Sequence, residues 1–466
     1  MFRLTHLTRV VLWVLVMYYS ELVQESIAEF ETKQYADILL DLALSRRDLF
    51  PRCNFNTIFC KEPRKLVSFD YLATIRKTSS QNCYFHVPFC RTECLYCSYE
   101  KMPYPTFDVL ERYLQALESE IERKQDVLRD DFNPDIFYVG GGTPTVLPHS
   151  ALRNFLQVLG RNFDLKKSLE FTVETTPQAI LGPDGIDKVM LLKESGVNRI
   201  NVGVQSLSEK VTRQNGRLQS KDDVIQCFQL LRDVGFEKIN LDLMYGLIGQ
   251  SMEVWQDDLQ SAVALGPDSI TTFSLRVRAP SALFVLATRG EVALPAEKEI
   301  LMMRIMAQHY LPRHGFIEDN ADYFIKSPDK RYLYQPFQPH NIHRNLIGFG
   351  PSAYTLAGDN QIFNLRVTND YLRISEQGAD PVDFVISLNR DEYMRKRLAE
   401  GLRTAFHDDS FRQEFGCSIF AFLGGVIRKL QEWDLVTVAG STIKLTFKGK
   451  IVHDQIAEYI KYSAVP

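Results

Sequence analysis

The chain has 466 residues, 45% of them hydrophobic, and a formal net charge of -4. This length exceeds that of an average domain, so two or three structural units are expected. The slightly acidic balance gives no electrostatic reason to expect a nucleic-acid partner. A chain of this size buries enough apolar surface to fold without disulfides.

Residues 1–75 show weak periodicity and are interpreted as an N-terminal extension. Residues 10–19 form an apolar run, preceded by Arg3 and Arg9. A transmembrane helix needs about 20 apolar residues, so the run is too short to span a bilayer. It resembles the start of a signal peptide, but no cleavage motif of small residues follows it. A packed or interfacial helix, a membrane-surface anchor and a targeting segment remain as interpretations.

A regular alternation of β-rich and amphipathic stretches begins near residue 84. The expected strands are residues 83–88, 135–139, 169–173, 199–204, 238–243 and 269–275. The expected helices are residues 107–128, 184–194, 222–234 and 252–264. Gly196, Gly235 and Gly266 end helices just before a strand, which suits a left-handed C-cap. Repeated alternation predicts parallel strands with crossover helices. The fold class is therefore α/β, a partial (β/α)6 barrel of the TIM type.

This interpretation divides the chain into four parts. They are an extension (1–75), a core barrel (76–300), a continuation or linker (301–375) and a C-terminal α+β unit (376–466). In the last part, helices at 389–403 and 418–433 precede a hairpin at 435–446 with a glycine turn. This order predicts a winged-helix-like unit. Its basic and acidic residues nearly balance, which favours a structural or lid role over DNA binding.

Four of the eight cysteines lie within residues 83–97. In a large chain such a group indicates metal binding rather than a disulfide framework. Three and then two residues separate Cys90, Cys94 and Cys97, so one loop can hold three corners of a cubic iron–sulfur cluster. The fourth iron then stays open to the amino and carboxylate groups of S-adenosylmethionine (SAM), and reductive cleavage of SAM would follow. Structural zinc is the alternative, with Cys83 or His86 as fourth ligand.

Residues 140–145 read Gly-Gly-Gly-Thr-Pro-Thr and follow the second expected strand directly. Three glycines let the backbone approach a ligand closely, although a plain turn is the simpler interpretation. Polar residues stand where later strands end: Glu174, Gln205 and Asp242. Side chains at such ends line the active site in barrel folds. Glu174 could bind an ammonium group, and Asp242 could bind a ribose hydroxyl or a cation.

Six motifs occur in order: the cysteine loop, GGGTPT, VETTP (173–177), RINVGVQS (199–206), GRLQ (216–219) and NLDLMYG (240–246). Together they resemble the oxygen-independent coproporphyrinogen III oxidase family of radical SAM enzymes, which includes the heme chaperones. The resemblance runs from about residue 80 to the end of the chain. It implies a [4Fe–4S] cluster on the three cysteines and one or two SAM molecules.

Carried over by position, the resemblance implies a SAM pocket made of several short motifs. Its residues would be Tyr84, Tyr96, Gly141, Gly142, Thr143, Glu174, Gln205, Arg217 and Asp242. Tyr84 and Tyr96 would flank the cluster and SAM, and Glu174 would hold the amino group of SAM. The glycine-rich stretch 348–354 matches a family region that lies near a second SAM.

Two departures bear on the subfamily. The oxidase has a fourth cysteine two residues after the third ligand, where this chain has Tyr99. The heme chaperones carry His-Asn-x-x-Tyr-Trp, whereas here His340-Asn341 lacks the aromatic pair. The leading hypothesis is a radical SAM enzyme that acts on a tetrapyrrole or another unsaturated metabolite. A one-electron donor such as flavodoxin or ferredoxin would serve it.

The alternative hypothesis is a heme or tetrapyrrole chaperone with little turnover, and His340 and His343 are its candidate axial ligands. An oxygen-sensitive cluster favours a cytoplasmic location in either case.

Overall fold

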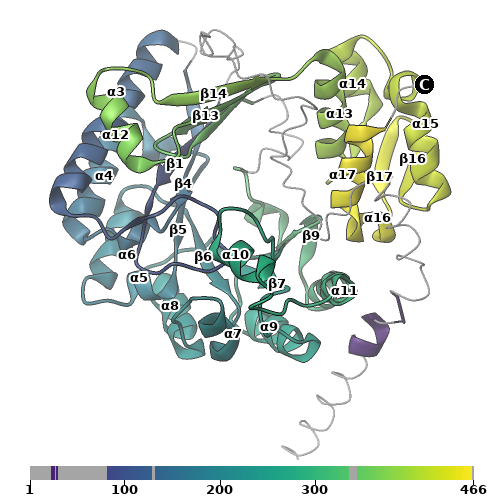
Figure 1. The fold of residues 1–466 in the computed structure, drawn as a ribbon, viewed down its shortest axis with the longest axis horizontal. Helices are drawn as coiled ribbons and strands as arrows, with labels where there is room; N and C mark the ends of the chain where they lie inside the picture. Colours follow the sequence, from purple (N-terminus) through teal and green to yellow (C-terminus); the bar gives the residue numbers. More distant parts are fainter. Residues whose placement is uncertain (1–21, 27, 30–80, 129–131, 335–343, 464–466) are drawn as a thin grey trace, which may run out of the picture.

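A computed structural model describes residues 22–26, 28–29, 81–128, 132–334 and 344–463. Within these ranges the largest feature is a sheet of 12 strands, flanked by helices and accompanied by a smaller C-terminal unit (Figure 1). No helix in the described part of the chain is long and apolar enough to cross a bilayer. The apolar run at residues 10–19 and the histidines at 340 and 343 lie outside the described residues.

Six parallel strands form the centre of the large sheet, and each pairs with the next along the chain. They are β1 (Gln81–Val87), β4 (Pro134–Gly141), β5 (Glu170–Thr175), β6 (Arg199–Gln205), β7 (Ile239–Tyr245) and β8 (Ser269–Ser274). This confirms the expected partial barrel. All six carboxyl ends meet at one edge of the sheet, where a barrel places its active site.

Helices connect these strands and cover the outside of the sheet, whereas α10, which follows β8, lies beside the cysteine loop (Figure 1). Their bounds are α3 (Phe107–Leu128), α4 (His149–Asn162), α5 (Pro177–Ile180), α6 (Gly185–Glu194), α7 (Glu209–Gln214), α8 (Lys221–Asp233), α9 (Met252–Ala264), α10 (Ala282–Thr288) and α11 (Glu297–Arg313). Gly196, Gly235 and Gly266 have φ values of 98°, 90° and 67°, so the expected left-handed ends are confirmed.

Five of these helices were not predicted from the sequence: α4, α5, α7, α10 and α11. The signal for α4 was present, because Leu152, Phe155, Leu156 and Leu159 are buried at helical spacing. The helix α11 is buried along most of its length, so it lacks the polar face that marks an amphipathic helix.

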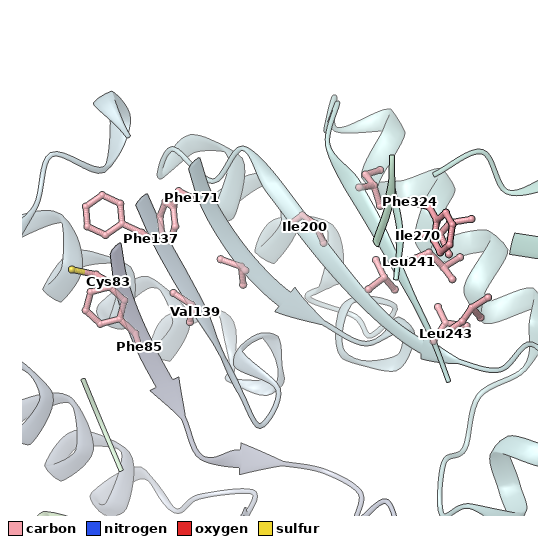
Figure 2. Packing of buried hydrophobic residues seen from close by; sticks show 14 of the residues in the cluster. Cys83, Phe85, Phe137, Val139, Phe171, Ile200, Leu241, Leu243, Ile270 and Phe324 are labelled. Atoms are coloured by element: carbon pink, nitrogen blue, oxygen red, sulfur yellow. The ribbon is translucent and has the colours of Figure 1, made fainter. Parts of the chain in front are cut away.

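Side chains alternate between two environments along the barrel strands. Cys83 and Phe85 of β1 and Phe137 of β4 point toward the helices and pack in the main apolar core (Figure 2). Their neighbours Tyr84 and Tyr138 point into the barrel and belong to a separate cluster rich in tyrosine. Successive residues of a strand face opposite sides of a sheet, so β1 and β4 serve the core and the barrel interior at once.

Residues 317–325 and 346–387 extend the sheet at both edges, and the division of the region after residue 300 between linker and C-terminal unit stays a prediction. The added elements are β9 (Ile317–Asn320), β10 (Tyr323–Ile325), β11 (Leu346–Phe349), β12 (Tyr354–Ala357), β13 (Asn360–Asn364), α12 (Thr368–Glu376) and β14 (Val382–Ser387). β10 joins β8 in antiparallel fashion, and β11 joins β1 in parallel. Among the described residues the sheet therefore ends in two separate edge strands, β9 and β14, and no strand pairing between them closes the barrel.

The C-terminal unit, yellow in Figure 1, contains helices around a three-stranded sheet. Its elements are α13 (Arg390–Gly401), β15 (Phe406–His407), α14 (Asp408–Phe415), α15 (Ile419–Glu432), β16 (Val436–Ala439), β17 (Thr442–Leu445), α16 (Phe447–Ile451) and α17 (His453–Tyr462). The expected hairpin is confirmed as β16 and β17, and Gly440 in its turn has a φ of 59°.

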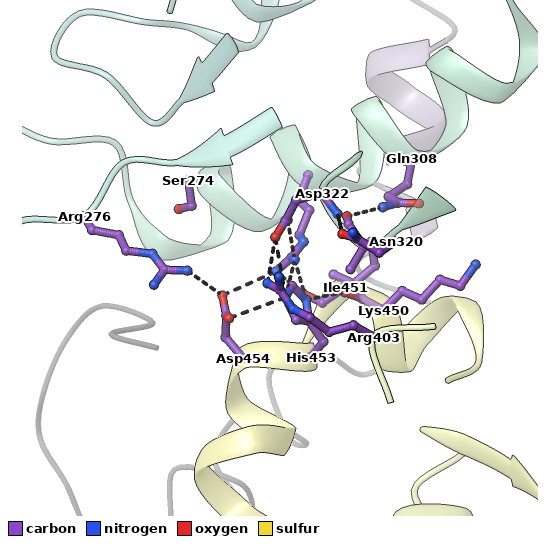
Figure 3. Close-up of polar contacts among 12 residues, drawn as sticks. Ser274, Arg276, Gln308, Asn320, Asp322, Arg403, Lys450, Ile451, His453 and Asp454 are labelled. Carbon is purple, nitrogen blue, oxygen red and sulfur yellow. Dashed lines mark hydrogen bonds and ion pairs between the residues drawn. The ribbon is translucent and has the colours of Figure 1, made fainter. Parts of the chain in front are cut away.

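A buried charged network joins this unit to the barrel (Figure 3). The carboxylate of Asp322 accepts hydrogen bonds from Arg304 of α11 at 2.9 Å and from Arg403 at 3.0 Å. His453, at the start of α17, contacts both guanidinium groups. Burial, reinforced by the nearby Arg304, lowers the pKa of His453 to about 3, so the imidazole is neutral. Asp322, with Asp454 at 3.8 Å from Arg304, therefore supplies the negative charge that offsets the arginines.

We expect Asp322→Asn to lower the free energy of unfolding by about 3–5 kcal/mol, because it removes the nearer carboxylate from the buried Arg304 and Arg403 and leaves Asp454, 3.8 Å from Arg304, to offset both. Denaturant titration measures the change. The control is Asp370→Asn, which removes an exposed ion pair with Arg373 and should cost under about 0.5 kcal/mol. Equal effects of the two substitutions would contradict a dominant role for the buried network.

Candidate active site

The cysteine loop leaves the carboxyl end of β1 and is tied at once to the glycine run. Gly142 N–H donates to the carbonyl of Val87 at 2.8 Å, and Thr143 N–H donates to that of Phe89 at 2.8 Å. The Sγ of Cys90 lies 3.8 Å from the hydroxyl oxygen of Thr143. Two segments 50 residues apart in the chain thus form one rigid unit at the mouth of the barrel.

The three cysteines of this loop are half-buried, whereas Cys83 is fully buried in the core. Burial raises the pKa of Cys90 to about 11; a hydrogen bond from Thr143 opposes this rise, while Cys97 and Cys94 nearby add to it. Burial likewise raises the pKa of Cys97. The thiols are therefore close enough to affect one another, and a bound metal would be needed to hold them as thiolates.

A second turn holds the other side of the loop. Leu95 N–H donates to the carbonyl of Asn215 at 3.1 Å, and Arg217 Nη1 lies 3.6 Å from the Sγ of Cys94. Gly216 has a φ of 79°, and a Cβ there would stand 2.6 Å from the carbonyl oxygen of Glu93. Only glycine allows this contact without a shift of the backbone.

The glycine run also approaches the barrel interior. Gly141 N–H donates to Glu174 Oε2 at 3.0 Å. Gly141 has a φ of 105°, and a Cβ there would lie 2.4 Å from the His86 ring. A Cβ on Gly140 would lie 2.6 Å from Glu174 Oε2. The run is therefore a close-packed backbone surface between His86 and Glu174, which is more than a plain turn requires.

Two buried carboxyl groups stand in the interior. Burial raises the pKa of Glu174 to about 7, a rise that Asp242 reinforces and that hydrogen bonds from Tyr138 and Gly141 oppose. Burial raises the pKa of Asp242 to about 6, against hydrogen bonds from Thr271 and Asn240. Shifted carboxyl groups in a cleft mark a candidate functional site. Both residues lie within their strands, slightly before the strand ends at which the sequence analysis had placed them.

Gln205 and Arg217 complete the ring around the mouth. Gln205 is the last residue of β6 and has a φ of 69°, an uncommon conformation for a residue with a side chain. Arg217 Nη2 donates to the carbonyl of Gly203 and to Gln219 Oε1. Burial raises the pKa of Tyr96, and Arg217 beside it opposes that rise. The GRLQ turn thus lies between the cysteine loop and the end of β6.

The predicted site residues form one continuous arrangement. It runs from Cys90 through Thr143 and Gly141 to Glu174, and then through Asp242 and Arg217 back to Cys94. Tyr84 adjoins it through a 2.9 Å hydrogen bond between its hydroxyl group and His86 Nδ1. The stretch 348–354 adjoins it too, because a Cβ on Gly350 would meet the His86 carbonyl oxygen at 2.6 Å.

Sequence reasoning missed two residues of this arrangement. His86 had been considered only as a zinc ligand, and Tyr138 not at all. Their signal was the alternation along β1 and β4, which places them on the same face as Tyr84. Tyr138 donates its hydroxyl hydrogen to Glu174.

The site has the character of a polar ligand site. His86 Nε2 and Gln205 Oε1 are buried and have no protein partner within the described residues, which is typical of atoms that bind a ligand or a water molecule. Within the described ranges, no three His, Cys, Asp or Glu side chains surround a single metal-ion position. Thiolates that bind different irons of a cluster need no such common point, and Cys83 is buried away from the loop. The residues fit a cluster and SAM better than zinc.

Comparisons with known proteins agree with this geometry. Residues 84–262 match the radical SAM superfamily. The heme chaperone HemW of Bacillus subtilis is 26% identical over 385 residues, which cover 81% of this chain and 98% of the chaperone. The oxygen-independent coproporphyrinogen III oxidase of Salmonella typhimurium is 26% identical, over 79% of this chain and 82% of the oxidase. Residues 84–262 therefore form a radical SAM domain.

The fold extends this likeness beyond the domain. Coproporphyrinogen III oxidase (HemN) from Escherichia coli superposes with a TM-score of 0.72 at 23% identity, over 84% of this chain and 93% of that one. The chain thus resembles the oxygen-independent coproporphyrinogen III oxidase and heme chaperone family of radical SAM enzymes. That family implies a [4Fe–4S] cluster and SAM as cofactors.

We expect Gly216→Ala to lower the iron bound per chain after anaerobic reconstitution, because its Cβ would displace the backbone at Glu93 and Cys94. Iron and sulfide analysis measures the loss. Gly235→Ala is the matched control, since Gly235 has a φ of 90° but open space around it. Both substitutions should cost about 1 kcal/mol or more of stability. An equal iron content in the two variants would contradict the proposal that Gly216 positions the cysteine loop.

A second expectation concerns pH. The pKa of Glu174 is raised from 4.5 to about 7, so its ionised form destabilises the folded chain. Glu174→Gln lacks this cost. The variant should therefore be no more stable than the parent below pH 4.5. Its stability advantage should grow as the pH rises from 4.5 to about 7 and reach about 3 kcal/mol above that pH.

Unfolding titrations of the cofactor-free protein across this interval test the expectation. The exposed Glu432→Gln serves as control and should show no such trend. A difference between Glu174→Gln and the parent that did not change with pH would contradict it.

Proposed function

We propose that Cys90, Cys94 and Cys97 bind a [4Fe–4S] cluster and that SAM binds beside it, so that the chain generates a SAM-derived radical and modifies an organic substrate. The observation that supports this most directly is the arrangement linking the cysteine loop, the glycine run and Glu174. When bound, the cluster supplies the electron that cleaves a carbon–sulfur bond of SAM.

The residues of this chain would bind, orient and shield the cofactors. Gly141 and Gly142 would contact SAM through their backbone, and the carboxylate of Glu174 would pair with the SAM ammonium group. Asp242 would accept hydrogen bonds from a ribose. Gln205, Arg217, Thr143, Tyr84 and Tyr96 would enclose the ligand, and the half-buried position of the loop limits access of water to it.

The substrate class that the relatives suggest is a tetrapyrrole, with another unsaturated metabolite as the broader possibility. Tyr99 stands where the oxidase has its fourth cysteine, so a reaction other than that of the oxidase is compatible with the site. A second SAM would bind near the stretch 348–354, which adjoins His86. A flavodoxin or ferredoxin is the proposed electron donor.

A second candidate function is heme or tetrapyrrole carriage with little turnover. The observation that favours it is the HemW match, which covers 98% of the chaperone. Its candidate ligands, His340 and His343, lie outside the described residues. Titration with heme tests this function: a Soret shift lost in a His340→Ala, His343→Ala variant would support it, and no shift would reject it.

The primary test uses protein purified without oxygen and reconstituted with iron and sulfide. With SAM and dithionite, we expect 5′-deoxyadenosine by mass spectrometry from the parent and none from the Cys90→Ala, Cys94→Ala, Cys97→Ala variant. Cys417→Ala, which removes a half-buried cysteine elsewhere, should keep the product. Product from the triple variant at the parent's level would overturn the proposal.

A further inference from the structure

Five tyrosines from three segments form a contiguous series of ring contacts inside the barrel, and Tyr354 lies beside Tyr84 at a centroid distance of 6.0 Å. They are Tyr84 of β1, Tyr138 of β4, Tyr323 of β10, and Tyr332 and Tyr334 just after β10. The ring centroids of Tyr138 and Tyr334 are 4.4 Å apart, and those of Tyr84 and Tyr138 are 5.9 Å apart. The ring centroid of Tyr332 lies 6.1 Å from that of Tyr138, in an edge-to-face contact, and 6.0 Å from that of Tyr323. We call this set the tyrosine chain.

A buried ion pair fixes the part of the tyrosine chain that contains Tyr332 and Tyr334. Arg199 and Glu170, both fully buried, pair at 2.9 Å at the amino ends of β6 and β5. Arg199 donates to the carbonyl groups of Lys330 and Arg331. Glu170 accepts from Leu333 N–H at 3.1 Å and from Tyr334 N–H at 3.0 Å. These hydrogen bonds hold residues 330–334 in a position in which Tyr332 and Tyr334 contact Tyr138.

The other part of the tyrosine chain, formed by Tyr84 and Tyr138, lies at the candidate SAM site. Tyr138 donates its hydroxyl hydrogen to Glu174, and the Tyr84 hydroxyl group lies 2.9 Å from His86 Nδ1. Tyr138 therefore has beside it a carboxyl group that can take a proton and return it, since the pKa of Glu174 is about 7. Tyr84 has a neutral imidazole beside it, because burial lowers the pKa of His86 to about 3. Burial raises the pKa of both phenols well above the ordinary value, so their O–H bonds are intact at neutral pH.

The stack also has an outlet to solvent. The ring of His86 is 5.8 Å from that of Tyr84 and 6.0 Å from that of Tyr99. Tyr99 is 58% exposed. Aromatic rings therefore follow one another from the barrel interior, past the glycine run, to the surface beside the cysteine loop.

We propose that the tyrosine chain is a redox relay that quenches the SAM-derived radical when no substrate is present, and that Tyr84 and Tyr138 are its entry points. The proposal rests on the proposed function. The O–H bond of a tyrosine breaks homolytically, and its hydrogen forms the new C–H bond of 5′-deoxyadenosine. The tyrosyl radical that remains is shared along the stack. One electron from the one-electron reductant that also serves the cluster, together with one proton through Glu174, restores the phenol.

This role has a chemical reason. Hydrogen transfer from a phenol to a primary alkyl radical is thermodynamically favourable, because the phenolic O–H bond is weaker than the C–H bond that forms. Without such a sink the radical would attack nearby C–H bonds of the backbone and side chains. Stacked rings let the unpaired electron move to neighbouring tyrosines and away from the cofactors.

The test is SAM cleavage without substrate in D2O, where tyrosine hydroxyl groups exchange their hydrogen for deuterium. We expect 5′-deoxyadenosine from the parent to gain one mass unit and the reaction, frozen during turnover, to show a tyrosyl radical by electron paramagnetic resonance. The Tyr84→Phe, Tyr138→Phe variant keeps the ring packing, and it should lose both the mass shift and the tyrosyl signal.

Tyr371→Phe is the matched control, since Tyr371 is also fully buried and donates to a carboxylate, that of Glu120, at 2.8 Å. It should keep both signals. The isotope ratio does not depend on yield, so weaker SAM binding by a variant does not disturb the result. Unlabelled product from the parent, or an unchanged mass shift in the double variant, would overturn the relay and leave the proposed function standing. Absence of 5′-deoxyadenosine from the parent would overturn both.

Discussion

The cysteine loop depends on backbone contacts that only glycine permits. Gly142 donates to the carbonyl of Val87, and a Cβ in its place would lie 2.5 Å from the Phe89 carbonyl oxygen. On the opposite side Gly216 lies against Glu93 and Cys94. These contacts join three loops that follow β1, β4 and β6. Because the three strands are parallel neighbours or near neighbours, their loops meet at one edge, and the position of each thiol follows from the sheet.

The interior beneath these loops combines groups that are costly to bury. Glu174 and Asp242 both have raised pKa values, and they share the space with tyrosine hydroxyl groups and with Asn201. Such groups favour a ligand that supplies positive charge and hydrogen bonds, as the ammonium and ribose of SAM would. Stability and ligand binding are therefore opposed at Glu174, as is common in functional sites. The tyrosine chain adjoins these groups without adding further charge.

The C-terminal unit is held by charge rather than by apolar packing alone. Arg304 and Asp322 from the barrel side meet Arg403, His453 and Asp454 from the other side (Figure 3). Arg276, just after β8, reaches Asp454 at 3.3 Å. The network thus touches the carboxyl end of the last parallel strand, near the mouth of the barrel. A position of this kind suits the structural or lid role expected for the unit.

Much of this could be predicted from local patterns. Strand and helix alternation gave the partial barrel, and the spacing of Cys90, Cys94 and Cys97 indicated a cluster, because both signals are contained in a few consecutive residues. The hidden helix α11 and the site residues His86 and Tyr138 could not be placed so easily. Their roles depend on which face of a strand or helix is buried and on which distant residues cover that face.

The sequence by itself therefore determined the order of the elements, the cluster motif and the glycines that surround it, since backbone conformation and ligand spacing are local properties. The tertiary structure alone decided which distant residues meet. It brought Arg217 to Cys94, Asp242 to Glu174, and Tyr334 to Tyr138. Contacts of this kind depend on strand order and on segments such as 330–334 that return to the barrel, and no local pattern encodes that return.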